Sequence, residues 1–118
     1  MRVLIPVDED NSLICPTFGR TPYFLLFDTE NKEKEILGNP AAQAQGGAGL
    51  QAAQFVLDNK VDIIITPRCG QNAADVFREA EIKIYKSEGQ SAEVNIENFV
   101  KGTLSLLEHF HSGYHGIK

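Results

Sequence analysis

The sequence of 118 residues contains no tryptophan, only two cysteines, and no apolar run approaching the about 20 residues that a membrane-spanning helix needs. Two cysteines far apart in the chain cannot form a disulfide framework. The 11 lysines and arginines form no cluster and are outnumbered by 16 acidic residues, so neither nucleic acid nor a membrane is expected as a partner. The opening residues 1–6 lack a secretory signal pattern, and we therefore expect a cytoplasmic protein.

What remains is ordinary globular composition, with 42% hydrophobic and 23% charged residues. The length suits one compact domain with a core of normal size. We assign residues 1–108 to this domain. Residues 109–118, which hold all three histidines, are expected to form a mobile tail.

Short apolar runs alternate with segments of helical spacing. Strands are predicted at residues 3–7, 23–27, 33–37, 62–66 and 83–85, and helices at 50–59, at 72–80 and after Ser91, where Ile96, Phe99 and Val100 form an apolar face. A short polar connection makes the second and third strands an antiparallel hairpin, and the right-handed crossover rule places the fourth strand parallel to the first. We predict an α/β fold of ribonuclease H-like topology, βββαβαβα, with a mixed five-stranded sheet of order 3-2-1-4-5 and helices on both faces.

This strand order brings two loops to one edge of the sheet. The loop after the first strand carries Cys15 and Arg20, and the turn after the fourth strand carries Arg68, Cys69 and Gly70. In open α/β sheets, ligands bind outside the carboxyl ends of the strands, where helix N-termini also point. We expect the glycine-rich segment 46–49, which leads into the first helix, close to the same edge.

The residue types at this edge suit an anionic metal–sulfur group. Thiolates of Cys15 and Cys69 would select copper(I), or iron in a sulfide cluster. Arg20 and Arg68 can clamp an anion, and the glycine-rich segment can bring backbone amides against it. Each feature also has a simpler explanation: free cysteine is often a compact hydrophobic residue, surface arginine is common, and glycines can serve a flexible helix start.

Two enzymatic readings and one non-enzymatic reading compete with a metal site. The spacing from Cys15 to Arg20 is one residue short of a phosphatase loop, and Pro16 removes an amide hydrogen, so thiol chemistry at Cys15 or Cys69 (phosphatase or reductase) is kept only as the enzymatic alternative. A metal-dependent nuclease using Asp8 and Asp10 is disfavoured, because no acid ends the fourth strand. The third reading is a protein-interaction module without a cofactor.

Four segments together resemble the dinitrogenase iron–molybdenum cofactor biosynthesis family, which includes NifX, NifY, the C-terminal part of NifB and the orange protein of sulfate-reducing bacteria. They are MRVLIPVDED, CPTFGRTPYF, NPAAQAQGGAGLQAAQ and TPRCGQNA, and the resemblance spans residues 1–102. It implies the ribonuclease H-like fold and the non-catalytic binding or carrying of a sulfide cluster containing molybdenum or iron. Thr17 stands where relatives commonly have histidine, and Gln71 where they often have proline, so Cys15 and Cys69 are candidates to replace the histidine.

We therefore expect a non-catalytic carrier or scaffold for a metal–sulfur cluster that contains iron, molybdenum or copper. Proteins that donate and accept the cluster are the expected partners. Cys15 and Cys69 are the predicted metal ligands, and the full predicted site consists of Cys15, Arg20, Gly46, Gly47, Arg68, Cys69, Gly70 and Asn72.

Overall fold

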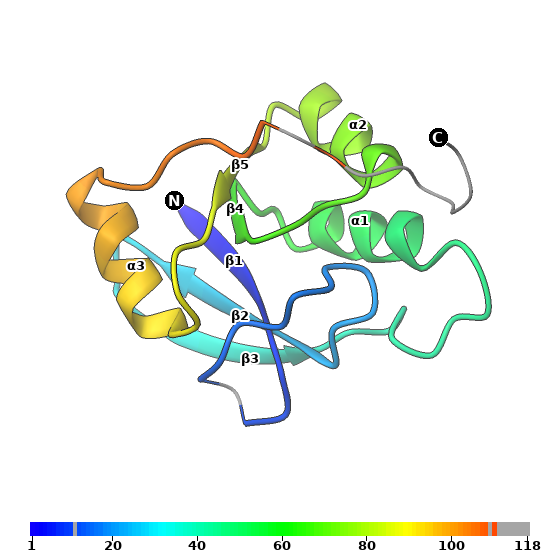
Figure 1. Ribbon diagram of the computed structural model, residues 1–118, viewed down its shortest axis with the longest axis horizontal. Helices are drawn as coiled ribbons and strands as arrows, with labels where there is room; N and C mark the ends of the chain where they lie inside the picture. Colours follow the sequence, from blue (N-terminus) through cyan, green and yellow to red (C-terminus); the bar gives the residue numbers. More distant parts are fainter. Residues whose placement is uncertain (11, 109, 111–118) are drawn as a thin grey trace.

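A computed structural model of the protein describes residues 1–10, 12–108 and 110, and the predicted mobile tail lies outside the described residues except for Phe110. The elements follow in the predicted order βββαβαβα (Figure 1). The strands are β1 (Arg2–Val7), β2 (Tyr23–Asp28), β3 (Lys34–Gly38), β4 (Ile63–Thr66) and β5 (Lys83–Lys86). The helices are α1 (Ala48–Asp58), α2 (Gln71–Glu79) and α3 (Ala92–Lys101).

The five strands form one mixed sheet of order β3-β2-β1-β4-β5, which confirms the predicted ribonuclease H-like topology. β1 pairs with β2 and β2 with β3 in antiparallel register, as expected for strands joined by a short polar turn. β1 pairs with β4 and β4 with β5 in parallel register, because α1 and α2 supply the crossovers. The loop after β1 and the turn after β4 consequently share one edge of the sheet.

Each face of the sheet is buried by helices (Figure 1). Alternate residues of the central strands, such as Leu4 and Ile64, pack against α1 and α2 in one hydrophobic cluster. Their neighbours, such as Ile5 and Ile65, pack against α3 in a second cluster. Successive side chains of a strand point to opposite faces, so a strand covered on both sides is apolar throughout, as these runs predicted.

The ends of α3 follow from its sequence. The Ser91 side chain caps the start of the helix by accepting a hydrogen bond from the Val94 amide at 3.2 Å, and Gly102 ends the helix with φ of 80°. Val100 was predicted to join the apolar face but is 60% exposed. Each residue advances about 100° around a helix, so Val100 lies one step past Phe99 and beyond the stripe that contacts the sheet. No helix among the described residues is long and apolar enough to cross a membrane.

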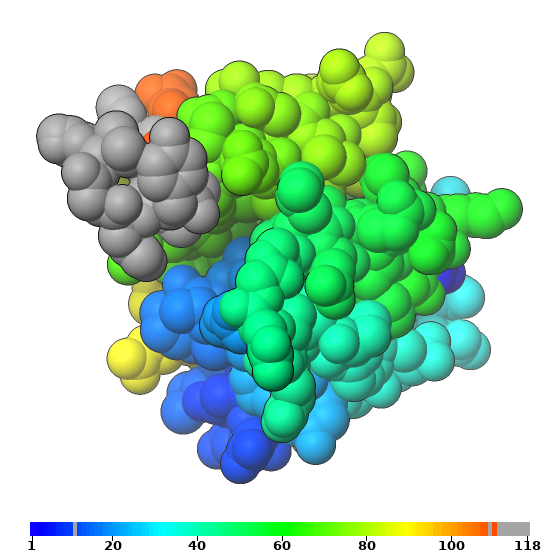
Figure 2. All heavy atoms as spheres, turned by 90° about the vertical axis from the view of Figure 1, so that its right-hand side faces the viewer, coloured from blue at the N-terminus to red at the C-terminus, as the bar shows by residue number. Residues whose placement is uncertain are grey.

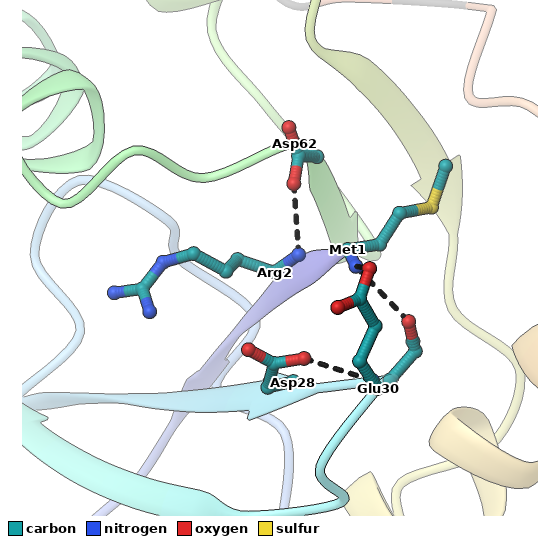
Figure 3. Close-up of polar contacts among 6 residues, drawn as sticks. Met1, Arg2, Asp28, Glu30 and Asp62 are labelled. Carbon is teal, nitrogen blue, oxygen red and sulfur yellow. Dashed lines mark hydrogen bonds and ion pairs between the residues drawn. The ribbon is translucent and has the colours of Figure 1, made fainter.

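Polar contacts fix the amino end of β1 (Figure 3). The Met1 amino group donates a hydrogen bond to Thr29 Oγ1 at 3.1 Å and lies 3.8 Å from a carboxylate oxygen of Glu30. The Arg2 amide donates to Asp62 Oδ2 at 2.9 Å, which ties β1 to the segment that enters β4. These contacts secure the amino ends of the parallel strands and leave the opposite edge of the sheet for a binding site.

Candidate functional site

A cleft of about 560 Å³ lies at the carboxyl edge of the parallel strands, between the first turns of α1 and α2. Figure 2 shows this side of the molecule, where the loop after β1 (blue) lies beside the segment that leads into α1 (green). The cleft is lined by Pro16, Thr17, Phe18, Gly19, Arg20, Gly46, Gly47, Ala48, Gly49, Leu50, Arg68, Gly70, Asn72 and Ala73. These residues come from the three loop segments that the sequence placed at this edge.

The loop after β1 is anchored by one aromatic side chain and by the strand that precedes it. Phe18 is buried, with its ring centroid 5.3 Å from that of Phe24 on β2 and 5.5 Å from that of Phe77 on α2. The Cys15 amide donates to the Pro6 carbonyl at 3.0 Å, and the buried Thr21 hydroxyl donates to the Val7 carbonyl at 2.8 Å. The wall that this loop contributes to the cleft is therefore held at both ends and in its middle.

The second wall is the start of α1, which has no side-chain cap. Gly47 precedes the helix with φ of 68°, a left-handed conformation that glycine adopts without strain. Among the described residues, no side chain caps this helix start, and its first turn contains no acidic residue. A Cβ atom placed on Gly46, Gly47 or Gly49 would meet nothing within 4 Å. The first amides of α1 have no partner within the helix, and Ala48 and Gly49, which carry two of them, line the cleft.

The third wall is the start of α2. Gly70, in an extended conformation, precedes this helix; no side chain of the described part of the protein caps it, and its first turn contains no acidic residue. Gly70, Asn72 and Ala73 all line the cleft. Helix N-termini carry a partial positive charge, so the cleft receives two of them.

Two arginines add full positive charges. Arg20 and Arg68 are exposed and line the cleft, whereas none of the described lining residues is acidic. Arg20 Nη1 donates to the Ala44 carbonyl at 2.6 Å, which leaves its other N–H groups for a ligand. Within residues 1–10, 12–108 and 110, neither guanidinium group forms an ion pair. The cleft is therefore arranged to hold an anion.

The two cysteines lie outside the lining of this cleft. Cys69 is 1% exposed and belongs to the cluster beneath α1 and α2, where burial raises the pKa of its thiol to about 12. Its Sγ lies 3.6 Å from the Gly70 carbonyl oxygen. Cys15 is half-buried, with Sγ 3.4 Å from Thr17 Oγ1. Among the described residues, no group of three or more histidine, cysteine or acidic side chains could hold a metal ion.

The structure thus brings together most of the predicted site, since the lining includes Arg20, Gly46, Gly47, Arg68, Gly70 and Asn72. Sequence reasoning missed Gly19 and Gly49, which face each other across two walls, and Leu50, which is 49% exposed at the cleft. The available signal for Gly19 was its place between Phe18 and Arg20 in a long loop.

Asp8 and Asp10, the carboxylates considered for a nuclease site, bind backbone amides of their own turn. Asp8 Oδ1 accepts a hydrogen bond from the Asp10 amide at 3.1 Å, and Asp10 Oδ1 accepts one from the Ser12 amide at 3.0 Å. Hydrogen bonds from Ser12 lower the pKa of Asp10. This pattern is that of a turn whose aspartates bond to their own backbone.

Comparisons with known proteins cover nearly the whole chain. A family model described as dinitrogenase iron-molybdenum cofactor matches residues 1–102. An uncharacterized protein of Methanocaldococcus jannaschii is 32% identical over 111 residues, which are 92% of each chain. The apo form of the orange protein from Desulfovibrio gigas superimposes with a TM-score of 0.83, at 24% identity, over 90% of this chain and 92% of that chain. A Thermotoga protein provisionally named NifB superimposes with a TM-score of 0.78, at 31% identity, over 98% of both chains.

Proposed function

The chain belongs to the dinitrogenase iron-molybdenum cofactor family, and from this premise we propose that it is a non-catalytic carrier or scaffold for an anionic metal–sulfur cluster. The cluster, of the iron-, molybdenum- or copper-sulfide type, is its cargo and binds in the cleft. One observation carries the proposal: two uncapped helix starts and two arginines converge on a cleft with no acid among its described lining residues.

The residues of the cleft suit such a cargo because sulfide ligands accept hydrogen bonds from N–H groups. Backbone amides at the starts of α1 and α2 supply N–H groups at fixed positions, and Arg20 and Arg68 supply charged ones. Two helix termini and two charge-assisted hydrogen bonds contribute about 4–8 kcal/mol together, before the entropic cost of association is subtracted. The Kd is therefore expected to be no lower than about 1 µM, which suits a cargo that is received from one protein and released to another.

Coordination of the metal by Cys15 and Cys69 is a different mode of holding the same cargo. It requires the Cys69 thiol, whose pKa lies at about 12, to leave the core and lose its proton. Amide and guanidinium contacts require no such rearrangement. We therefore propose that hydrogen bonds and charge hold the cluster. A variant that lacks both thiols tests the alternative, in which the thiolates ligate the metal.

The experiment is reconstitution without oxygen, with iron and sulfide or with tetrathiomolybdate and copper(I), followed by metal analysis and visible absorption. Arg20→Gln combined with Arg68→Gln should weaken uptake at least about tenfold, because both charge-assisted hydrogen bonds are lost. Arg78→Gln makes the matched charge change at the far end of α2, where the guanidinium lies 4.9 Å from the Phe110 ring, and should leave uptake unchanged.

Each other outcome overturns a stated part of the proposal. If the Arg20 and Arg68 variants take up cargo like the parent, the cleft is not the site. If Cys15→Ser combined with Cys69→Ser abolishes uptake while Arg78→Gln does not, thiolate ligation holds the cluster. Turnover of a phosphoester or a disulfide by metal-free protein would establish the thiol enzyme. A protein that shows neither visible absorption from a bound cluster nor turnover would fit the interaction module without a cofactor.

A further inference from the structure

A single buried amide joins two walls of the cleft without lining it. Asn39 follows directly after β3 and is 8% exposed. Its Nδ2 donates hydrogen bonds to the Gly19 carbonyl at 3.0 Å and to the Thr21 carbonyl at 2.9 Å. Its Oδ1 accepts a hydrogen bond from the Ala41 amide at 2.9 Å. The side chain therefore links the loop after β1 to the segment that leads into α1.

The contact that Asn39 secures has no spare room. A Cβ atom on Gly19 would lie 3.1 Å from the Gly49 nitrogen and 3.2 Å from its Cα, closer than nine in ten real Cβ contacts. Gly19 is thus seated against the first turn of α1, and its carbonyl is one of the two that Asn39 binds. The separation between the loop and the helix start is set at this point.

The backbone of Asn39 strengthens the same link. Its amide donates to the Pro22 carbonyl at 3.1 Å, and its carbonyl accepts from the Ala42 amide at 3.2 Å. A second side chain that connects the two walls is the exposed Arg20, whose guanidinium donates to the Ala44 carbonyl and also lines the cleft. Of these two side chains, Asn39 is the buried one, and it does not line the cleft.

We propose that Asn39 is a positioning residue for cargo binding: it holds Gly19 against the start of α1 and so fixes the Arg20 wall relative to the α1 amides. The inference rests on the proposed function for the identity of the cargo. Buried hydrogen bonds that orient the groups in contact with a ligand govern affinity without touching it, since misplaced donors lose alignment.

The test substitution is Asn39→Asp, which keeps the size of the side chain and one acceptor oxygen. It replaces the Nδ2 donor with an oxygen that faces the carbonyls of Gly19 and Thr21. The chain offers a matched control in Asn95, which is fully buried and donates from Nδ2 to the carbonyls of Glu88 and Ser91, both at 2.8 Å. Asn95 lies on α3, on the opposite face of the sheet, so Asn95→Asp causes the same chemical loss away from the cleft.

Titration with tetrathiomolybdate, followed by absorbance, measures the affinity of each variant. Asn39→Asp should raise the Kd roughly 10- to 100-fold, as loss of an orienting hydrogen bond does at other ligand sites. Asn95→Asp should change it by less than about twofold, because distant sites act independently. Parent-like affinity of Asn39→Asp, or an equal loss in both variants, would overturn the proposal.

Hydrogen–deuterium exchange separates this inference from the proposed function. Even if the parent binds no cargo, Asn39→Asp should speed exchange in residues 15–22 and 41–50, and Asn95→Asp should not. Unchanged exchange in both segments would show that Asn39 does not position the walls. If Asn39→Asp does not fold, Gly19→Ala tests the same contact from the other side, since its methyl group would lie 3.1 Å from the Gly49 nitrogen and the two walls must separate by a few tenths of an ångström to admit it. Parent-like exchange and affinity in Gly19→Ala would then refute the positioning role.

Discussion

Alkylation of the native protein with iodoacetamide should distinguish its two thiols sharply. The thiolate is the reactive form, and burial raises the pKa of Cys69 from 9.0 to about 12. At about pH 8, a thiol of pKa 9 is ionised in about one molecule in ten, and one of pKa 12 in about one in ten thousand. Ionisation alone therefore slows Cys69 about a thousandfold relative to an ordinary thiol. Because its side chain is also 1% exposed, the reagent must wait for local opening of the core.

The assay is mass spectrometry of the labelled peptides over time, with and without denaturant. One label should enter the native parent, at Cys15, and the second should enter only on unfolding. Cys15→Ser should remain unlabelled while native, and Cys69→Ser should label like the parent. Native labelling of Cys69 at the rate of an ordinary thiol would refute its placement in the core. It would also make a thiolate at position 69 readily available to a metal.

Three further predictions concern stability, each measured by urea denaturation. Native Cys69 keeps its proton up to a pH of about 12, whereas the thiol of the unfolded chain loses it above pH 9.0. The free energy of unfolding should therefore fall as the pH rises from 9.0 toward 12, by up to about 1.4 kcal/mol per pH unit. Cys69→Ala should remove this pH dependence. Phe18→Ala should cost about 3–5 kcal/mol through lost packing with Phe24 and Phe77, whereas a loss below about 1 kcal/mol would mean that the loop is not anchored there. Gly102→Ala should cost roughly 1–2 kcal/mol, because φ of 80° strains any residue with a Cβ, and an unchanged midpoint would contradict this.

The fold was largely predictable because local patterns and connection rules both constrain it. The apolar runs of β1 and β4 could only be buried on both faces, and the crossover rule then fixed their parallel pairing. The short turn between β2 and β3 fixed the hairpin. Neither inference depended on which side chains pack together.

The direction in which an individual side chain points was harder to predict from the sequence. Cys69 was expected at the edge of the sheet, and its backbone is there, but its side chain turns into the core. Val100 was expected on the apolar face of its helix and is exposed, because it lies at the margin of the apolar stripe of α3. A stripe shows which face is buried but not where its margin lies.

The links that shape the cleft leave no local signal at all. Asn39 bonds to carbonyls 18 and 20 residues earlier in the chain. Gly19 meets Gly49 only because the sheet brings the loop after β1 to the start of α1. Such pairs become visible only when the elements are assembled.

The central claim is that the cargo lies against the first turns of α1 and α2. The most direct measurement is a series of amide nitrogen–proton correlation spectra recorded while tetrathiomolybdate is added to nitrogen-15-labelled protein. We expect the largest shift changes at four amides of residues that line the cleft: Ala48, Gly49, Asn72 and Ala73. Changes concentrated instead around the separate groove of about 460 Å³ that Tyr23 and Phe55 help to line, or no changes at all, would contradict it.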